Sequence, residues 1–225
     1  MNRQRVRTVS GGGRAVEVEP ERLDGWYARF AERHGGVRCT EIEPDTVVVH
    51  AEDGARAEVT VPFGPLPGPV GRQEGLVVRP LVDHLSRPRR IGLVLVRLGG
   101  HSVGIAEGTR LVTSSTDRHP VHGRHKAGGW SQQRFARRRE GQARQALRAA
   151  ADAVARVLLP VAEGLDAVVL GGDRSALATL GEDRRLAGLL ARAEPRVLDV
   201  AEPRLAVLRE AVRRARAVEV VVFEP

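Results

Sequence analysis

The sequence predicts a mixed α/β fold, a mixed β-sheet flanked by helices on both faces. Hydrophobic residues make up 42% of the 225 positions, which is enough for a substantial core. β-rich runs in the first half come in pairs around turn residues, which is typical of hairpins. Later runs alternate between strand length and helical period, a βαβα pattern that favours helices on both sides of a sheet. The length predicts one larger domain, residues 76–225, and a small α+β unit, residues 1–75, which could pack as part of one domain.

The N-terminal unit is predicted to combine one helix with one hairpin. The helix begins at Pro20 and ends near Gly35. Its apolar face, spaced as a core-facing face should be, consists of Leu23, Trp26, Tyr27 and Phe30. Runs 46–51 and 57–61 surround the turn residues Glu52, Asp53 and Gly54 and predict the hairpin. The proline- and glycine-rich stretch Pro62–Arg72 then indicates either a boundary or a long ordered loop.

The remainder of the chain predicts further strands and helices in alternation. A short helix at Pro80–Leu85 precedes a tight hairpin, Ile91–Leu98 with Ser102–Ala106, to which Arg110–Ser115 adds a third strand. A long helix follows over residues 131–159. The predicted elements after it are a strand at 167–170, a helix at 176–193, a strand at 196–200, a helix at 203–215 and a strand at 218–223.

The long helix has an apolar stripe in its second part alone. The stripe consists of Ala143, Leu147, Ala150, Val154 and Val157 or Leu158. Before Ala143 the helix offers little apolar surface apart from Phe135 and Ala136. We therefore expect its first two to three turns to project from the domain.

The net charge of +8 is concentrated in one segment. Residues 118–148 hold nine basic residues against the single acid Glu140, which equals the excess of the whole chain. A segment with so few acidic residues is more typical of a docking site for a phosphate-rich polyanion than of a charged helix face that is only exposed to solvent. Aromatic residues are scarce at 3%, which argues against a base-stacking single-strand binder. We expect a cytoplasmic protein, because no apolar run is long enough for a signal peptide or a membrane span.

Two candidate metal or redox features are judged weak. His119, His122 and His125 are evenly spaced, but zinc needs a fixed scaffold and usually a fourth ligand, so RNA contact or loop polarity is favoured. Cys39 is the single cysteine, which excludes an internal disulfide and a multi-cysteine zinc site. We interpret its thiol as inert. We predict no metal and no cofactor. Leu170-Gly171-Gly172-Asp173 is interpreted as a tight turn with Asp173 capping a helix, rather than as a phosphate cradle.

The loop before the long helix carries the most informative pattern. Gly128 and Gly129 allow backbone conformations closed to other residues. Ser131 is a suitable N-cap, which places Gln132 and Gln133 in the first helical turn. Basic residues predicted to bind RNA surround them: Arg124, Lys126, Arg134, Arg137, Arg138 and Arg139. A tip of small residues and neutral amides with a cationic collar suits insertion into an RNA-lined cavity.

The run Gly128-Gly129-x-Ser131-x-x-Arg134-Phe135-Ala136-Arg137 resembles the GGQ loop and following helix of archaeo-eukaryotic class I peptide-release factors. The resemblance covers Leu81 to the C-terminus and is closest to the Vms-like release factors of the short actinobacterial type. It implies that 76–225 is a release-factor-like catalytic domain with a GGxSQQ loop at 125–134. It also implies peptidyl-tRNA hydrolysis on stalled ribosomes or large subunits, without stop-codon reading.

This chain departs from the release-factor tripeptide at its third position, where Trp130 replaces glutamine. Trp130 and Ser131 would occupy the loop tip, Gln132 is the first candidate to position the attacking water, and Gln133 is the second. The implied partners are large-subunit rRNA at the peptidyl-transferase centre and peptidyl-tRNA, with neither membrane nor DNA. The alternative function is a non-catalytic ribosome- or RNA-binding adaptor that uses the same basic projection.

Overall fold

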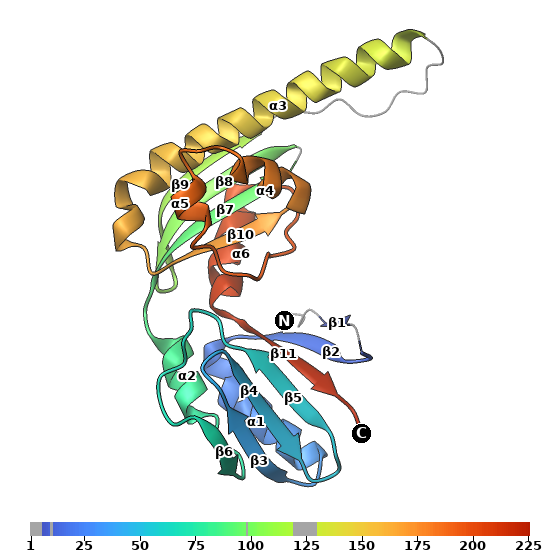
Figure 1. Ribbon diagram of the computed structural model, residues 1–225, viewed down its shortest axis with the longest axis vertical. Coiled ribbons are helices and arrows are strands. Elements are labelled where there is room, and N and C mark those ends of the chain that lie inside the picture. Colours follow the sequence, from blue (N-terminus) through green and yellow to red (C-terminus); the bar gives the residue numbers. More distant parts are fainter. Residues whose placement is uncertain (1–5, 10, 98, 119–129) are drawn as a thin grey trace. The chain divides into compact units, whose positions relative to one another are not determined.

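The computed structural model describes residues 6–9, 11–97, 99–118 and 130–225, with side chains described outside 130–139 (Figure 1). The chain forms two compact units. Unit 1 combines Met1–Arg87 with Arg213–Pro225, and unit 2 is Pro88–Val212. Each unit contains one β-sheet. The predicted mixed α/β class is confirmed.

Unit 1 is built on a seven-stranded antiparallel sheet, sheet A, ordered β1-β2-β11-β5-β4-β3-β6. Its strands are β1 (Val6–Thr8), β2 (Arg14–Val18), β3 (Val37–Ile42), β4 (Thr46–Ala51), β5 (Arg56–Thr60), β6 (Gly71–Glu74) and β11 (Val218–Phe223). Helices α1 (Pro20–Arg33) and α2 (Arg79–Ser86) share one hydrophobic core with these strands. The predicted helix and the hairpin of β4 and β5 are confirmed.

The apolar face of α1 lies in that core, as its spacing predicts. Leu23, Tyr27 and Phe30 are buried, and Trp26 packs against the cluster while stacking on Phe30 at 5.8 Å between ring centroids. The hydroxyl of Tyr27 has no hydrogen-bond partner among the described residues, and burial raises its pKa well above the ordinary value. These aromatic residues therefore serve packing.

Unit 2 is built on a mixed four-stranded sheet, sheet B, ordered β10-β7-β8-β9. Its strands are β7 (Arg90–Arg97), β8 (Gly100–Glu107), β9 (Arg110–Arg118) and β10 (Ala167–Gly172), with β10 parallel to β7 and the other pairs antiparallel. Helices α3 (Trp130–Leu158) and α4 (Arg174–Gly181) cover one face. Helix α6 (Leu205–Arg216) covers the other, where a Cβ on Gly104 would lie 3.0 Å from Leu208 Cδ2. Helices on both faces are thus confirmed.

The predicted division at residues 75 and 76 is not where the chain divides. Helix α2 packs on α1 and contributes Leu81 and Leu85 to the core of unit 1, so this unit extends to Arg87. The predicted closing strand is present as β11, but it pairs with β2 and β5 in sheet A. The stretch Pro62–Arg72 is therefore an ordered loop within unit 1.

Three local predictions after residue 130 also need correction. Helix α3 begins at Trp130, so Ser131 lies inside the helix and is not its N-cap. The predicted helix over 176–193 is two helices, α4 and the short α5 (Ala187–Leu190). The predicted strand at 196–200 forms a single bridge between Leu198 and Gly171. A 3₁₀ helix, η1 (Leu159–Gly164), follows α3.

The helices that the structure describes include none that is both long enough and apolar enough to cross a membrane. The longest, α3, carries its charged residues throughout.

Candidate nucleic-acid interface

Helix α3 is held on unit 2 by its second half. Ala150, Val154 and Leu158 of the predicted stripe are buried in the core of unit 2, and Leu147 is partly buried against it. Ala143 is only half-buried, and Ala146, outside the predicted stripe, is the first buried residue in the part of the helix whose side chains are described. From Glu140 to Gln145 no side chain is buried. A helix rises about 1.5 Å per residue, so its start lies about 24 Å from Ala146 along the axis. Figure 1 shows this first part of α3 running past the strands of sheet B.

Some of the predicted catalytic and binding residues belong to the first turns of this helix. The backbones of Gln132 and Gln133 belong to the first turn of α3, and Arg134 and Arg137–Arg139 follow in the next turns. Their side chains, and those of Trp130 and Ser131, lie outside the described residues, as do Arg124, Lys126, Gly128, Gly129 and the three histidines of 119–125. The predicted roles of all these residues stay predictions.

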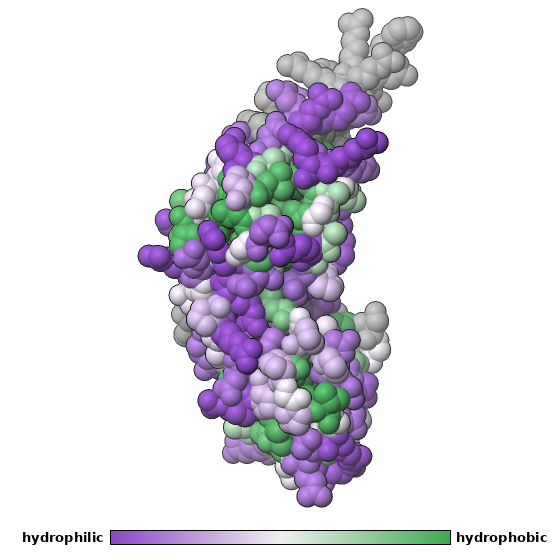
Figure 2. Space-filling model, turned by 60° about the vertical axis from the view of Figure 1, so that its left-hand side comes forward, coloured by the Kyte–Doolittle hydropathy of each residue, from purple (hydrophilic) through white to green (hydrophobic). Residues whose placement is uncertain are grey.

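The described part of α3 continues the basic character. Arg144 and Arg148 are exposed, and the described residues include no ion-pair partner for either. Arg156 is also exposed and donates a hydrogen bond to Ser115 Oγ of β9 at 3.0 Å. In Figure 2 hydrophilic residues cover the surface of unit 2 next to the grey atoms. Uncompensated guanidinium groups on a solvated helix suit phosphate oxygens, which they bind with paired N–H donors.

The exposed edge strand β9 ends at Arg118, whose charge acts on the carboxylate of Glu202. The pKa of Glu202 is held below its ordinary value, mainly by hydrogen bonds from Arg204 and to a smaller extent by the charge of Arg118.

The turn at the end of β10 is tight, as predicted, but the predicted capping of α4 by the Asp173 side chain is wrong. A Cβ on Gly171 would lie 2.7 Å from Leu95 Cδ2, and one on Gly172 would lie 2.0 Å from the carbonyl oxygen of Val96. Asp173 occupies the N-cap position of α4, but its side chain makes no capping hydrogen bond. Instead its carboxylate lies 3.3 Å from Arg97. The glycines face protein atoms, which leaves no phosphate cradle here.

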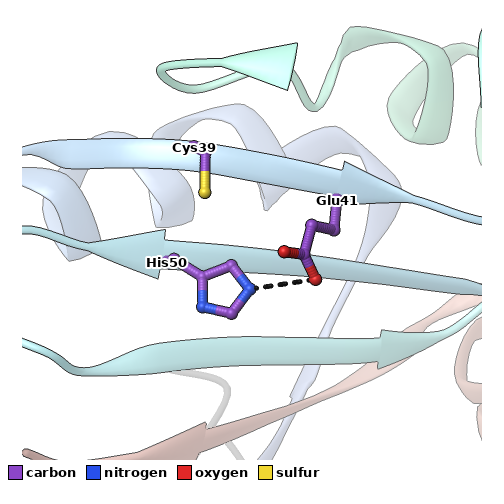
Figure 3. Close-up of side chains that lie close together, drawn as sticks. All are labelled: Cys39, Glu41 and His50. Atoms are coloured by element: carbon purple, nitrogen blue, oxygen red, sulfur yellow. Dashed lines mark ion pairs between the residues drawn. The ribbon is translucent and has the colours of Figure 1, made fainter. Parts of the chain in front are cut away.

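The structure also brings together a group of polar side chains that the sequence analysis did not predict to be neighbours. Cys39, Glu41 and His50 of unit 1 bring one potential ligand atom each within 4.8 Å of one another (Figure 3). Cys39 and Glu41 come from β3, a strand that the sequence analysis did not predict. The signal that could have found them is Cys39-x-Glu41 next to a hairpin strand containing His50.

Comparison with known proteins identifies the family. Residues 89–221 match the family described as the Actinobacteria/chloroflexi VLRF1 release factor. The chain belongs to this family. The resemblance drawn from the glycine-rich loop and the following helix is confirmed, and the match covers nearly all of unit 2 and the first four residues of β11.

One curated protein and several solved structures are similar to parts of this chain. Peptide chain release factor subunit 1 of Aeropyrum pernix is 31% identical over 144 residues, which are 61% of this chain and 38% of that protein. The chain thus spans less than half the length of this relative. Among solved structures, the match with the archaeal translation termination factor aRF1 covers 76% of this chain and 47% of the aRF1 chain, at 20% identity and a TM-score of 0.43. The match with Dom34 of S. cerevisiae covers 93% of this chain and 66% of the Dom34 chain, at 11% identity and a TM-score of 0.34.

Proposed function

We propose that this protein hydrolyses the peptidyl-tRNA ester and so releases nascent chains from stalled ribosomes or large subunits without reading a stop codon. The observation that carries the proposal is the family match over 89–221, which encloses the sequence Gly128-Gly129-x-Ser131-Gln132-Gln133 at the start of α3. Its partners would be large-subunit rRNA and peptidyl-tRNA.

The shape of α3 supports delivery of this sequence into a confined site. In the part of the helix whose side chains are described, burial begins at Ala146, and the glutamines lie about 20 Å from this residue along the axis. By helical period, Arg137, Arg144 and Arg148 share one face of α3. This face would follow an RNA backbone while the buried face stays on sheet B.

A glutamine amide fits the chemistry of the step. The ester needs an attacking water in line and hydrogen bonds to the developing oxyanion, and an amide offers one acceptor and two donors without charge. A carboxylate at the same place would be repelled by surrounding phosphates. Gln132 is our first candidate for the residue that positions the attacking water, and Gln133 is the second. Gly128 and Gly129 would let the loop reach the ester. A backbone N–H of the loop would share the oxyanion, RNA groups would complete the proton path, and no metal or cofactor takes part in the step.

The decisive experiment measures release of nascent chains from purified ribosome–nascent-chain complexes. Gln132→Ala and Gln133→Ala identify the working residue, and the double variant should lose about a hundred- to a thousandfold in rate, the usual worth of such a donor. Gln145→Ala is the matched control, because Gln145 is an exposed glutamine of the same helix in its described part. Full activity in the double variant would remove glutamine from the mechanism.

The non-catalytic adaptor is the second candidate, because the uncompensated Arg144 and Arg148 provide docking without chemistry. Binding to large subunits at several salt concentrations separates the two functions. Replacing both arginines by glutamine should weaken binding and flatten its salt dependence, by about one unit of slope for each lost phosphate contact. An adaptor would show this response and no release activity in the unaltered protein.

A further inference from the structure

We infer that unit 1 carries a binding site for a divalent transition metal, with Zn²⁺ as the fitting ion, made by Cys39, Glu41 and His50. The site lies on the face of sheet A opposite α1 (Figure 3). It falls outside residues 89–221, so the family match does not assign it.

The register of sheet A brings the three side chains together. Cys39 on β3 pairs directly with His50 on β4, and Glu41 lies two residues along β3 on the same face. Their neighbour Thr40 points the other way, where its hydroxyl donates to the carbonyl of Gly75 at 2.7 Å. Because the strands fix the backbone at each position, a ligand would meet a scaffold that is already formed.

The distances suit one ion after small side-chain movements. The three potential ligand atoms lie within 4.8 Å of one another, and His50 Nε2 is 3.3 Å from Glu41 Oε2. A tetrahedral zinc ion with bonds of about 2.0–2.3 Å holds its ligand atoms roughly 3–4 Å apart. Rotations that shift the ligand atoms by about 1 Å would close the site, and a water molecule would take the fourth position.

Burial gives the site a reason to take an ion. Cys39 is 2% exposed, and the Nε2 atom of His50 is shielded from solvent yet makes no hydrogen bond among the described residues. A shielded imidazole nitrogen that has only the ion-pair contact with Glu41 and no hydrogen bond costs free energy, which coordination would recover. Sulfur, nitrogen and oxygen ligands together fit a borderline ion such as zinc better than magnesium or calcium, which take oxygen. On binding, the thiol of Cys39 loses its proton to solvent.

The charged residues that flank the cluster on the neighbouring strands are two basic and two acidic, Arg56, Arg72, Glu58 and Glu74. Arg56 pairs with His50 in the register, but its Nε donates to Glu58 at 2.6 Å and its guanidinium lies 4.1 Å above the ring of Phe223. On the other side, β6 places Glu74 opposite Cys39 and Arg72 opposite Glu41. With Glu41 and a thiolate, the site would carry two negative charges against the ion.

Cobalt substitution in the full-length chain tests the site directly. The chain has one cysteine, so a thiolate-to-cobalt charge-transfer band after addition of Co²⁺ to metal-free protein can come from Cys39 alone. We expect this band at one equivalent and its displacement by Zn²⁺. Cys39→Ser should abolish the band, and Glu41→Gln and His50→Gln should weaken cobalt binding at least tenfold.

Two controls keep the test decisive. Glu32→Gln changes an exposed carboxylate of α1, away from the cluster, and should bind cobalt as the unaltered protein does. Thermal unfolding of each metal-free variant shows whether it is folded, and Zn²⁺ should raise the midpoint of the unaltered protein and of Glu32→Gln but not of Glu41→Gln. Absence of the band in folded, reduced protein overturns the site. So does a band that persists unchanged in both Glu41→Gln and His50→Gln.

Discussion

Gly172 shows how a single residue decides the geometry of a turn. It ends β10 with φ at +106°, in the left-handed region that favours glycine. The carbonyl of Val96 accepts a hydrogen bond from the N–H of Asp173 at 2.9 Å, and this contact brings the backbone of β7 against the turn. Both the conformation and the close approach therefore require a residue without a Cβ.

Gly172→Ala should strongly destabilise unit 2. The added Cβ would lie 2.0 Å from the Val96 carbonyl oxygen, so the turn must open at a cost of at least about 2 kcal/mol. Chemical denaturation followed by circular dichroism measures the loss. Gly181→Ala is the control: it ends α4, its Cβ would meet no atom within 4 Å, and alanine there should be neutral or stabilising by up to about 1 kcal/mol. Equal stability of the two variants would contradict this account.

At the scale of elements, strand β3 marks the limit of sequence reasoning. The helix and hairpins around it followed from clear periodicity, but Val37–Ile42 does not alternate between apolar and polar residues. Cys39 and Thr40 are adjacent, face opposite sides and are both buried. Thr40 is tolerated in the core because its hydroxyl binds the backbone of Gly75 and Val77. That satisfaction comes from distant residues, so no local pattern reveals it, and the cluster around Cys39 was missed with the strand.

The predicted helix over 176–193 was too long for a related reason, since the structure divides this range into α4 and α5. Leucines keep a helical spacing through the break, and Leu180, Leu186 and Leu189 all reach the core of unit 2. The break is made by the turn at Asp183, whose carboxylate accepts hydrogen bonds from the backbone and side chain of Arg185. The guanidinium of Arg185 and these hydrogen bonds lower the pKa of Asp183. A side-chain contact of this kind competes with the helix without altering its apolar period.

The C-terminal end of α6, which belongs to unit 1, carries a row of ion pairs within that unit. Arg213, Arg214 and Arg216 pair with Glu19, Glu17 and Glu21. The pair of Arg214 is the most enclosed, with side chains 7% and 16% exposed and two hydrogen bonds at 2.6 and 3.0 Å. Such a bidentate pair fixes the helix end on β2.

Arg214→Ala should therefore cost about 3–5 kcal/mol, because it leaves the carboxylate of Glu17 enclosed beside a cavity. Urea unfolding followed by tryptophan fluorescence measures the change. Arg79→Ala removes an exposed pair with Asp83, one turn apart on α2, and should change the free energy of unfolding by no more than about 0.5 kcal/mol. If the Arg214 variant were as stable as the Arg79 variant, the enclosed pair would have no structural weight.

At the scale of the whole molecule, the two sheets follow from connections that span nearly the full sequence. Sheet B is assembled from residues within Pro88–Val212, and its hairpins were predictable because their turns are short. Sheet A needs β11, which lies between β2 and β5 although it ends the chain. An apolar run such as Val218–Phe223 fits either sheet, since sequence period fixes the strand but not its partner. The region matched by the family also includes parts of both units, because it begins in unit 2 and ends inside β11 of sheet A.

This arrangement predicts different fates for the two units when they are separated. Fragment 88–212 retains every strand of sheet B and should fold. Fragment 1–87 should not, because without β11 the hairpin of β1 and β2 separates from β5, and the core loses Val218, Val220 and Val222. Joining 213–225 to fragment 1–87 through a flexible glycine–serine linker should restore a dispersed NMR spectrum and cooperative unfolding. A fragment 1–87 that unfolds as cooperatively as the joined form would show that sheet A does not depend on β11.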